Sequence, residues 1–441
     1  MCSFNIIKKI KNKLSKINYY AQKRGPDHTN TKEINNITFI HNLLHITGKM
    51  TIQPFEKNNI VCVFNGEIYN YKKFGKYDSD GQCLIDLYEK YGIEFTKLLD
   101  GEFAIALIDF NKNIILISTD IFSTKPLFYC FYKANFMISS YGKCIELNKM
   151  KGIKKLEANK TMVFDLNSFK KLDEIVLHTF QLNQFKDNYD DWNKAFTNSI
   201  KKRASNLQRK LFVSLSGGYD SGAICCELNN QKIKYNSYTV NGKEDRKVLG
   251  ERNKINNTNS KNYDLNENII EKYVEKNNTN CCNYIRKVRE NVDRAPYEVL
   301  KDRASAGCSF ICENARKDGC IISLSGQGAD EIYSDYGFNG KTYTWHSCFG
   351  GKYPDDLSKI FPWESFFSGI GQCLIMKEEI IGGSHGIEQR YPFLDKEVVQ
   401  EFLWLKPELK NKYYKAPIHN YLTMNKYPFK LNQKVGFNCL Y

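Results

Sequence analysis

Residues 213–221 of the chain read VSLSGGYDS, and this stretch decides the fold of the second half. It continues a short apolar run that begins at Lys210, and the segment that follows, SGAICCELNN, has apolar residues at helical spacing. The next run, KYNSYTV, is rich in residues that favour strands. A strand, a glycine turn, a helix and a further strand in this order predict a parallel α/β sheet.

The glycine turn in this stretch has the composition of a phosphate-binding loop. Gly217 and Gly218 allow the backbone to approach an anion, and the helix that follows offers free N–H groups at its positive end. Asp220 fits beside phosphates only when a cation joins it, and Mg²⁺ is the natural choice. The alternative is a serine-glycine hairpin turn without a ligand. Because the turn lies after a strand and before a helix, it resembles the pyrophosphate loop of the adenylate-forming ATP pyrophosphatases. The ATP and pyrophosphate ligands expected here are Leu215, Ser216, Gly217, Gly218, Asp220, Ser221 and Val240.

A second strand and turn, CIISLSGQGADEIYSDYG at residues 320–337, matches the first. Ser325 and Gly326 are expected to approach the nucleotide, while Asp330 and Glu331 could supply further metal-facing carboxylates. Alone, this stretch would be an ordinary glycine turn that opens an acidic helix. Paired with the first turn, it predicts a metal site that uses Asp220 and Asp330.

The first half of the chain has a different pattern. From about residue 36 to 166 it consists of short apolar, β-rich runs separated by turn residues, which predicts stacked antiparallel sheets. One helix, GQCLIDLYEKYG, interrupts them. The predicted fold is therefore an α+β N-terminal domain followed by an α/β domain with a parallel sheet.

The boundary between these domains is expected near residues 170–190. The segment DNYDDWNKAFTNSIKKRASNL begins with acidic residues and ends with basic ones, which suits a helix that opens a second domain. We expect domains at 2–175 and 185–441. Residues 251–283 are so rich in Asn and Lys that a mobile surface insertion is expected there.

Cys2 is a candidate nucleophile. Removal of Met1 would leave its thiol beside a free α-amino group, whose neutral form can accept the thiol proton. Any cysteine at the second position would look the same, so the interpretation depends on context. In the segment FNGEIYNY, Asn65 and the N–H group of Gly66 could donate to an oxyanion, and Glu67 with Asp80 could hold an ammonium group.

Composition excludes several classes of protein. The 441 residues, 42% of them hydrophobic, indicate a globular protein with two or three domains. The formal net charge of +15 is spread along the chain without a basic stripe, so nucleic-acid binding is not favoured. The 15 cysteines occur without a signal peptide or a zinc-binding spacing, and no apolar stretch is long enough for a membrane. A cytoplasmic protein with free thiols is expected.

Together these motifs resemble the glutamine-hydrolysing asparagine synthetase family, in which a class II glutamine amidotransferase domain of the N-terminal nucleophile type precedes an ATP pyrophosphatase-like domain. The similarity extends to the segments TDIFSTKPLFY, KDRAS, GIEQRYPFLD and QKVGF. It implies that Cys2 releases ammonia from glutamine and that ATP activates a carboxylate as an acyl-adenylate. It also implies that Lys434 closes on the pyrophosphate and that ammonia crosses between the sites in a tunnel.

Two positions depart from the family pattern. Leu43 stands where the family has an Arg that grips the glutamine carboxylate, and such a charge-assisted hydrogen bond contributes about 1.5–3 kcal/mol. Gln327 stands where the family has a Glu thought to assist amide formation, and an amide cannot accept that proton. A neighbour such as Glu331 or Glu388 could replace it.

The sequence therefore predicts an ATP- and Mg²⁺-dependent ligase that uses glutamine and a small acid, with aspartate as the default acceptor. The alternatives are an amide ligase for a different acid and a non-catalytic homologue that binds nucleotide. Candidate acceptor-side residues are Arg303, Glu388 and Arg390, although each Arg could instead pair structurally with Glu388 or Asp302. A homodimer is left open.

Overall fold

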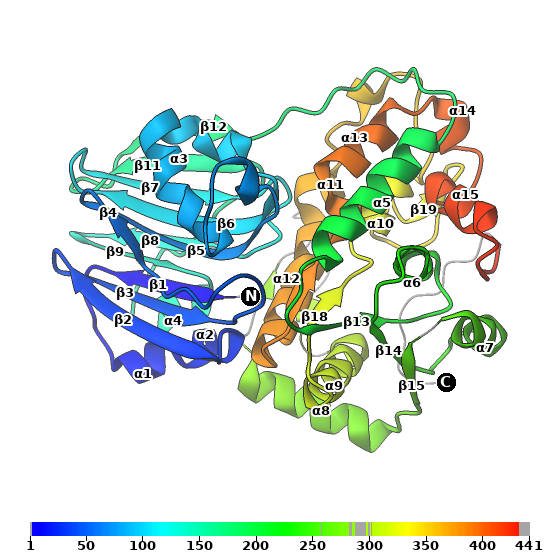
Figure 1. The fold of residues 1–441 in the computed structure, drawn as a ribbon, viewed down its shortest axis with the longest axis horizontal. Coiled ribbons are helices and arrows are strands. Elements are labelled where there is room, and N and C mark those ends of the chain that lie inside the picture. Colours follow the sequence, from blue (N-terminus) through cyan, green and yellow to red (C-terminus); the bar gives the residue numbers. More distant parts are fainter. Residues whose placement is uncertain are drawn as a thin grey trace. The chain divides into compact units, whose positions relative to one another are not determined.

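The computed structural model describes residues 2–256, 258–281, 300 and 302–431, together with the backbone of 285–286 and 297–298. The chain divides into two units, the first formed mainly by Met1–Thr179 and the second mainly by the residues from Phe180 onward. Figure 1 shows the helices and strands of both units.

The first unit contains two six-stranded sheets in which all strand pairs are antiparallel. The strands of one sheet, in spatial order, are β10 (Lys154–Lys155), β8 (Phe128–Tyr132), β9 (Asn135–Ser139), β1 (Ser3–Ile7), β3 (Ile37–Leu43) and β2 (His28–Ile34). Those of the other are β12 (Lys171–Val176), β11 (Lys160–Asp165), β7 (Ile114–Thr119), β6 (Gly101–Asp109), β5 (Ile60–Ile68) and β4 (Phe55–Lys57). The predicted stacked antiparallel sheets are confirmed.

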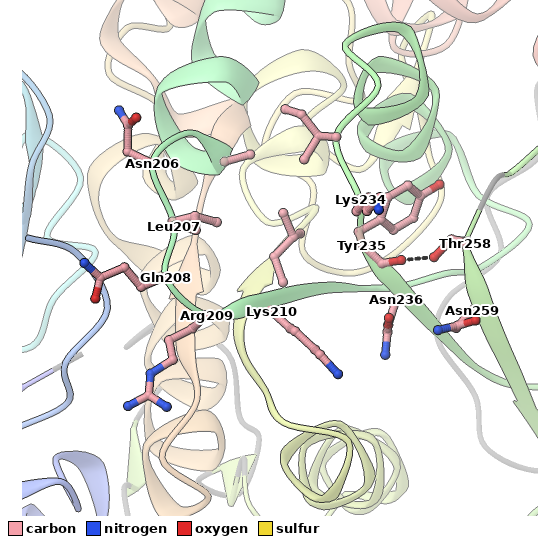
Figure 2. Close-up of a pocket in the computed structure, with 13 residues that line it drawn as sticks. Asn206, Leu207, Gln208, Arg209, Lys210, Lys234, Tyr235, Asn236, Thr258 and Asn259 are labelled. Carbon is pink, nitrogen blue, oxygen red and sulfur yellow. Dashed lines mark hydrogen bonds between the residues drawn. The ribbon is translucent and has the colours of Figure 1, made fainter.

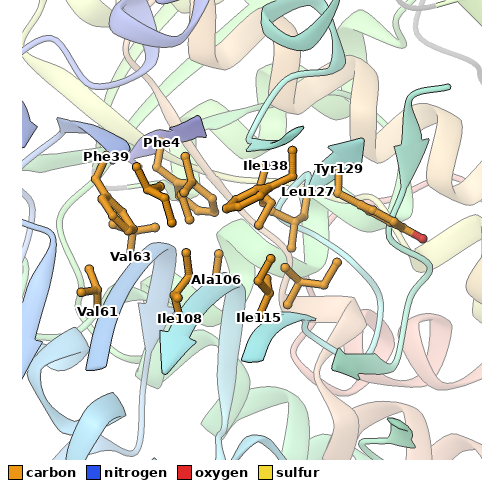
Figure 3. Packing of buried hydrophobic residues seen from close by; sticks show 14 of the residues in the cluster. Phe4, Phe39, Val61, Val63, Ala106, Ile108, Ile115, Leu127, Tyr129 and Ile138 are labelled. Atoms are coloured by element: carbon orange, nitrogen blue, oxygen red, sulfur yellow. The ribbon is translucent and has the colours of Figure 1, made fainter. Parts of the chain in front are cut away.

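Alternating side chains of the two sheets form a common core. Phe4 and Phe39 from one sheet and Val63 and Ala106 from the other belong to a single buried cluster (Figure 3). This interdigitation of inward-facing residues is what holds two antiparallel sheets face to face. The first unit also contains the helices α1 (Leu14–Ile17), α2 (Tyr19–Arg24), α3 (Cys83–Tyr91) and α4 (Gly142–Leu147). Helix α3 is the predicted one, and it ends at Gly92 with a φ of 60°.

The second unit is built on a five-stranded parallel sheet, as predicted. Its strands, in spatial order, are β15 (Asn259–Tyr263), β14 (Asn236–Val240), β13 (Lys210–Ser214), β18 (Cys320–Leu324) and β21 (Glu388–Arg390). Short antiparallel pairs are formed by β16 (Ile285–Arg286) with β17 (Tyr297–Glu298) and by β19 (Gly337–Phe338) with β20 (Lys341–Thr342). Because all five sheet strands are parallel, the turns that follow β13 and β18 lie at the same edge.

Helices connect and cover these strands. They are α5 (Asp190–Ala204), α6 (Tyr219–Asn230), α7 (Arg246–Ile255), α8 (Glu267–Asn280), α9 (Arg303–Lys317), α10 (Ala329–Tyr333), α11 (Glu364–Phe367), α12 (Gly369–Ser384), α13 (Lys396–Trp404), α14 (Pro407–Lys410) and α15 (Ala416–Met424). Helix α5 has acidic residues in its first turn and basic residues in its last, as the sequence predicts. Among the described residues, none of the helices combines the length and apolar composition needed to cross a membrane. Each cysteine in the described part of the chain has a free thiol.

The segment predicted as a mobile insertion, 251–283, contains regular structure in its described part. It includes the end of α7, the strand β15 and the helix α8. Strand β15 pairs in parallel with β14 over five residues and so completes the sheet. The high content of Asn and Lys reflects an exposed sheet edge and an exposed helix face, which need few apolar residues. Mobility of the segment stays a prediction.

Candidate functional site

Two glycine turns meet at the carboxyl edge of the parallel sheet. Residues 215–218 follow β13 and residues 325–328 follow β18, and these two strands are neighbours. A Cβ atom at Gly326 would lie 2.8 Å from the Cβ of Asp220, so only glycine allows the two turns to approach this closely. The two motifs that the sequence paired are therefore in direct contact.

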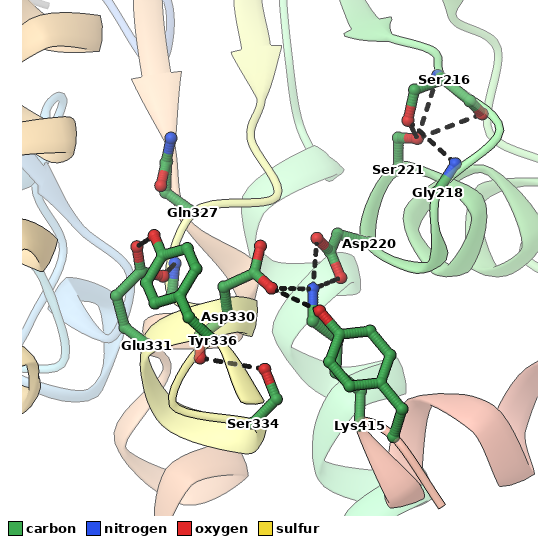
Figure 4. Close-up of polar contacts among 12 residues, drawn as sticks. Ser216, Gly218, Asp220, Ser221, Gln327, Asp330, Glu331, Ser334, Tyr336 and Lys415 are labelled. Atoms are coloured by element: carbon green, nitrogen blue, oxygen red, sulfur yellow. Dashed lines mark hydrogen bonds and ion pairs between the residues drawn. The ribbon is translucent and has the colours of Figure 1, made fainter. Parts of the chain in front are cut away.

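The first turn is organised by its own hydroxyl groups. The Ser216 N–H donates to Ser221 Oγ at 3.1 Å, and the Gly218 N–H donates to Ser216 Oγ at 3.1 Å (Figure 4). The Gly217 N–H donates to Glu244 Oε2 at 2.6 Å. Burial raises the pKa of Glu244, although the Gly217 N–H opposes this shift. An acidic oxygen therefore occupies a position where the turn can bind an anion.

Arg252 holds this turn through hydrogen bonds to its backbone. Its Nη1 donates to the carbonyl oxygens of Ser216 and Gly218, the latter at 2.9 Å, and its Nε donates to the Pro428 carbonyl at 2.8 Å. A Cβ atom at Gly222 would lie 2.4 Å from Arg252 Nη2. Arg252 lies in α7, within the segment that was predicted as an insertion, so composition hid a fully buried residue that shapes the turn.

Asp220 and Asp330 face one another across a lysine. Lys415 Nζ lies 2.6 and 2.7 Å from the carboxylate oxygens of Asp220 and 2.9 Å from Asp330 Oδ1 (Figure 4). The Tyr414 hydroxyl donates to Asp330 Oδ1 at 2.7 Å. Burial lowers the pKa of Lys415, but the two carboxylates outweigh this effect and its pKa lies above the ordinary value. Asp220 and Asp330 therefore define one position for a positive charge.

Lys415 was missed by the sequence reasoning. It precedes α15 in the left-handed conformation, with φ of 49°, and its side chain is buried. Such a backbone conformation costs a residue with a side chain about 1–2 kcal/mol, so the surrounding structure holds it there. The only signal in the sequence is Pro417, which marks the start of a helix just after the lysine.

The residues present fit Mg²⁺ in their chemistry. Carboxylate oxygens are hard donors, and those of Asp220 and Asp330 already converge on one cation. Within the described residues no group of three or more His, Cys, Asp or Glu side chains could hold a metal alone. Phosphate oxygens would have to complete the coordination, which is the usual arrangement for Mg²⁺ at nucleotides.

Glu331 does not face this position, contrary to the sequence prediction. The Gly328 N–H donates to Glu331 Oε2 at 2.9 Å, and the Tyr336 hydroxyl donates to Oε1. Glu331 is 3% exposed and holds the second turn in shape. The reason is the helix start at Ala329, which places Glu331 at the third helical position, where its carboxylate accepts the N–H of the N-cap residue Gly328.

Leu215, Val240 and Ser325 are also predicted to bind the nucleotide, and these roles stay predictions. The Leu215 N–H donates to the Tyr238 carbonyl at 2.9 Å, and Val240 is buried at the end of β14. The Ser325 N–H donates to the Arg390 carbonyl at 2.9 Å. Lys434 lies outside the described residues.

The predicted acceptor-side residues are engaged with protein groups. Arg303 Nη2 lies 2.7 Å from Glu267 Oε1, and both side chains are about half exposed, at 56% and 47%. Arg390 Nε lies 2.7 Å from Glu388 Oε1 in a buried pair, and its Nη1 donates to the Arg203 carbonyl at 2.7 Å. Of the structural pairings considered from sequence, that between Arg390 and Glu388 is present, whereas Arg303 pairs with Glu267 instead of Asp302.

In the first unit, Cys2 lies just before β1 and is 8% exposed. Its carbonyl oxygen accepts a hydrogen bond from Arg24 Nε at 2.9 Å. Arg24 is itself fully buried, so it fixes the backbone of Cys2 from the protein interior. Met1 lies outside the described residues.

Asn65 and Gly66 lie next to each other in β5. Asn65 is fully buried, and neither its Nδ2 nor its Oδ1 atom has a hydrogen-bond partner within the described part of the chain. An unpaired buried amide costs about 1–3 kcal/mol, so it is retained only where a ligand or another function uses it. Gly66 has φ of 135°, and a Cβ atom there would lie 1.9 Å from the Glu102 carbonyl oxygen. Both features suit a pair of oxyanion donors.

The two carboxylates predicted to hold an ammonium group lie near the end of the same strand. The Thr47 hydroxyl lies 3.1 and 3.3 Å from the two oxygens of Glu67. Asp80 Oδ2 accepts the Ile68 N–H at 2.8 Å. Leu43, at the end of β3, is 7% exposed and offers no charge to a glutamine carboxylate.

A separate groove lies at the opposite edge of the parallel sheet. It has a volume of about 790 Å³ and is lined by Lys210, Asn236 and Asn259, the first residues of three strands, together with Arg209 and Lys234 (Figure 2). Because the glycine turns follow the carboxyl ends of β13 and β18, this groove is not part of the candidate site.

Each half of the chain matches a known protein family. The glutamine amidotransferase domain family matches residues 1–182, and the asparagine synthase family matches residues 191–360. A putative glutamine-hydrolysing asparagine synthetase of Methanocaldococcus jannaschii is 28% identical over 413 residues, covering 86% of this chain and 71% of that protein. The human glutamine-hydrolysing asparagine synthetase is 24% identical and covers 88% and 73%.

The chain therefore combines a glutamine amidotransferase domain with an asparagine synthase domain, and over most of its length it is similar to glutamine-hydrolysing asparagine synthetases. It is therefore a ligase of the type that joins glutamine use to ATP-driven amidation. Among solved structures, the Bacillus subtilis glutamine phosphoribosylpyrophosphate amidotransferase aligns over the full length of both chains at 10% identity and a TM-score of 0.33. That likeness is too low to bear on the activity of this asparagine synthetase relative.

Proposed function

We propose that the protein converts a small carboxylic acid, aspartate by default, into its amide through an acyl-adenylate, with ammonia from glutamine. The observation that carries this proposal is the convergence of Asp220 and Asp330, from two glycine turns, on one cation position. A paired carboxylate site beside an anion-binding turn suits a metal-bound triphosphate.

In the nucleotide site, the first turn would bind the pyrophosphate portion of ATP. The N–H groups at the start of α6 point toward this turn, and a phosphate oxygen would take the place that Glu244 Oε2 holds on Gly217. Asp220 and Asp330 would hold Mg²⁺, which neutralises phosphate charge. Lys415 would then be released from the carboxylates to contact the phosphates.

In the glutamine site, the Cys2 thiolate would attack the side-chain amide carbon of glutamine, and the α-amine freed by Met1 removal would take the thiol proton. Asn65 Nδ2 and the Gly66 N–H would donate to the oxyanion. Glu67 and Asp80 would hold the α-ammonium group of glutamine. Ammonia leaves, and water hydrolyses the thioester to glutamate.

A second candidate is amidation of an acid other than aspartate. It is favoured by the pairing of Arg303 with Glu267 and of Arg390 with Glu388, because each guanidinium already binds a carboxylate of the protein. Acceptor choice therefore depends on residues that motifs do not identify.

The proposal is tested with purified protein, ATP, Mg²⁺ and either glutamine or ammonium, while candidate acids are supplied in turn. Pyrophosphate release and the mass of the amide are measured for each acid. We expect aspartate to give both signals. Pyrophosphate and amide from another acid alone would favour the second candidate, and neither signal from any acid would contradict ATP-driven amidation.

A further inference from the structure

A carboxyl group that no motif marks lies against the second glycine turn. Glu378 is part of α12, and its Oε1 accepts a hydrogen bond from Gln327 Nε2 at 3.3 Å. Its other oxygen, Oε2, is buried and has no hydrogen-bond partner among the residues that the structure describes. Lone pairs of a buried carboxyl group are normally satisfied, so the unpaired Oε2 of Glu378 is an acceptor that a bound ligand would use.

The other two carboxylates considered near Gln327 are already committed. Both oxygens of Glu331 accept hydrogen bonds from the turn and from Tyr336. Glu388 forms a buried ion pair with Arg390, whose Nε donates to Glu388 Oε1 at 2.7 Å. Glu378 therefore differs from both in having an oxygen that can accept a proton without breaking an existing bond.

The surroundings of Glu378 bring the pKa of its carboxyl group close to neutral pH. Burial raises the pKa of Glu378 to about 7, while the Ser325 hydroxyl, the Gln327 amide and the positive charge of Lys377 oppose the shift. A base is most effective when its pKa lies near the working pH, because it is then ionised and still basic. Ser325 belongs to the turn that is expected to approach the nucleotide, so Glu378 contacts that turn at both Ser325 and Gln327.

We propose that Glu378 is the general base of the amide-forming step and that Gln327 positions it through the Nε2–Oε1 hydrogen bond. This inference rests on the proposed function. The ammonia nitrogen forms a bond to the acyl carbon of the adenylate, and the bond from that carbon to the phosphate oxygen breaks. AMP leaves with the electron pair of that bond, and the proton lost by the nitrogen moves to Glu378 Oε2. Glu378 thus supplies the carboxyl group that the family resemblance places at position 327.

The test separates adenylate formation from amide formation in Glu378→Gln. ATP–pyrophosphate exchange should remain at the level of the unmodified protein, because Glu378 accepts its hydrogen bond from Gln327, whereas Asp220 and Asp330 are paired with Lys415. Amide formation from ammonium should fall by about 10²–10⁴-fold, the usual contribution of general-base catalysis. Glu397→Gln, an exposed residue in the first turn of α13, is the matched control and should change neither rate.

Hydroxylamine in place of ammonium distinguishes a base from a structural residue. It is a stronger nucleophile whose nitrogen loses its proton more readily, so Glu378→Gln should slow hydroxamate formation much less than amide formation. Equal losses with both nucleophiles would show a structural role and overturn the inference. If Glu378→Gln does not fold, Glu378→Met is used, because it also lacks the carboxyl group, and an unchanged amide rate in that variant would likewise overturn the inference.

The two proposals fail in different ways. Intact exchange with unimpaired amide formation in Glu378→Gln contradicts only the role of Glu378. Absence of exchange in the unmodified protein with every acid contradicts the proposed function itself.

Discussion

The two candidate sites differ in whether their polar groups have partners within the protein. At the glycine turns of the second unit, charged groups are matched internally, since Lys415 joins Asp220 to Asp330 and Glu244 holds the Gly217 N–H. At β5 of the first unit, Asn65 is buried with neither amide atom hydrogen-bonded to any described residue. The nucleotide site keeps its charges paired, whereas the glutamine site keeps a donor unpaired.

This difference follows from the cost of each group. Two carboxylates facing each other would repel strongly in a buried setting, so a cation must stay between them when no metal is bound. A single neutral amide costs only about 1–3 kcal/mol when unpaired, which a folded domain can tolerate. On the proposed function, ATP would have to displace internal partners, while glutamine would bind to a donor that has no partner among the described residues.

The largest expected effect is on stability and comes from Lys415. Lys415→Met leaves Asp220 and Asp330 without their shared cation, and removing one partner of a buried charge group costs about 3–5 kcal/mol. The free energy of unfolding in urea, measured without ATP or Mg²⁺, should fall by that amount. Lys412→Met is the control, because Lys412 lies nearby in the chain and is exposed.

The triple variant Asp220→Asn, Asp330→Asn and Lys415→Met removes the charges together and should recover most of the lost stability. If Lys415→Met unfolds like the unmodified protein, the paired-charge description of the nucleotide site is wrong.

Whether the sequence predicts a site residue depends on whether the residues that define its role lie close to it in the chain. The turns were predicted because VSLSGGYDS and SLSGQGADE carry their function within a few consecutive residues. Lys415 was not, because its partner Asp220 is 195 residues away and a single lysine has no pattern. Glu378 had a weak signal, since the charged run KEE at residues 377–379 interrupts the mostly apolar helix from Gly369 to Ser384.

The fold was predicted from local patterns of the same kind. The prediction missed the strand at residues 259–263, where it relied on composition instead. Residues 259–263 read NSKNY, which looks like a loop, yet they form the edge strand β15 because backbone pairing with β14 does not require apolar side chains. Arg252 was overlooked for the same reason, since its burial depends on the tertiary fold and not on its neighbours in sequence. The roles of Cys2, Asn65 and Gly66 stay predictions.

The next effect is on glutamine hydrolysis and concerns Asn65. Asn65→Ala removes one oxyanion donor, and glutaminase kcat should fall by about 10²–10³-fold. Unlike Lys415→Met, it removes an unsatisfied amide, so the free energy of unfolding should change little. Asn59→Ala, an exposed residue in the turn before β5, is the control for the assay. Unchanged glutaminase activity, or a large loss of stability with it, would break the contrast between the two sites.

The smallest effect concerns Leu43. Leu43→Arg would supply a positive charge for the glutamine carboxylate, and a charge-assisted hydrogen bond of about 1.5–3 kcal/mol corresponds to a KM about 10- to 150-fold lower. With kcat unchanged, such a decrease means that the added interaction stabilises the bound substrate and the transition state equally. Leu43→Met keeps the apolar volume and serves as the control. A KM for glutamine that does not fall would show that another group already holds the carboxylate.

ATP–pyrophosphate exchange in Asp220→Asn and Asp330→Asn tests the central claim most directly, with aspartate and Mg²⁺ present and Asp318→Asn as control. Asp318 is bonded to Lys261 and Tyr238, away from the turns. We predict that the unmodified protein and the control catalyse the exchange, and that each of the two turn variants loses it because phosphates and carboxylates then lack a complete metal site. Exchange at the unmodified rate in both turn variants would contradict the account.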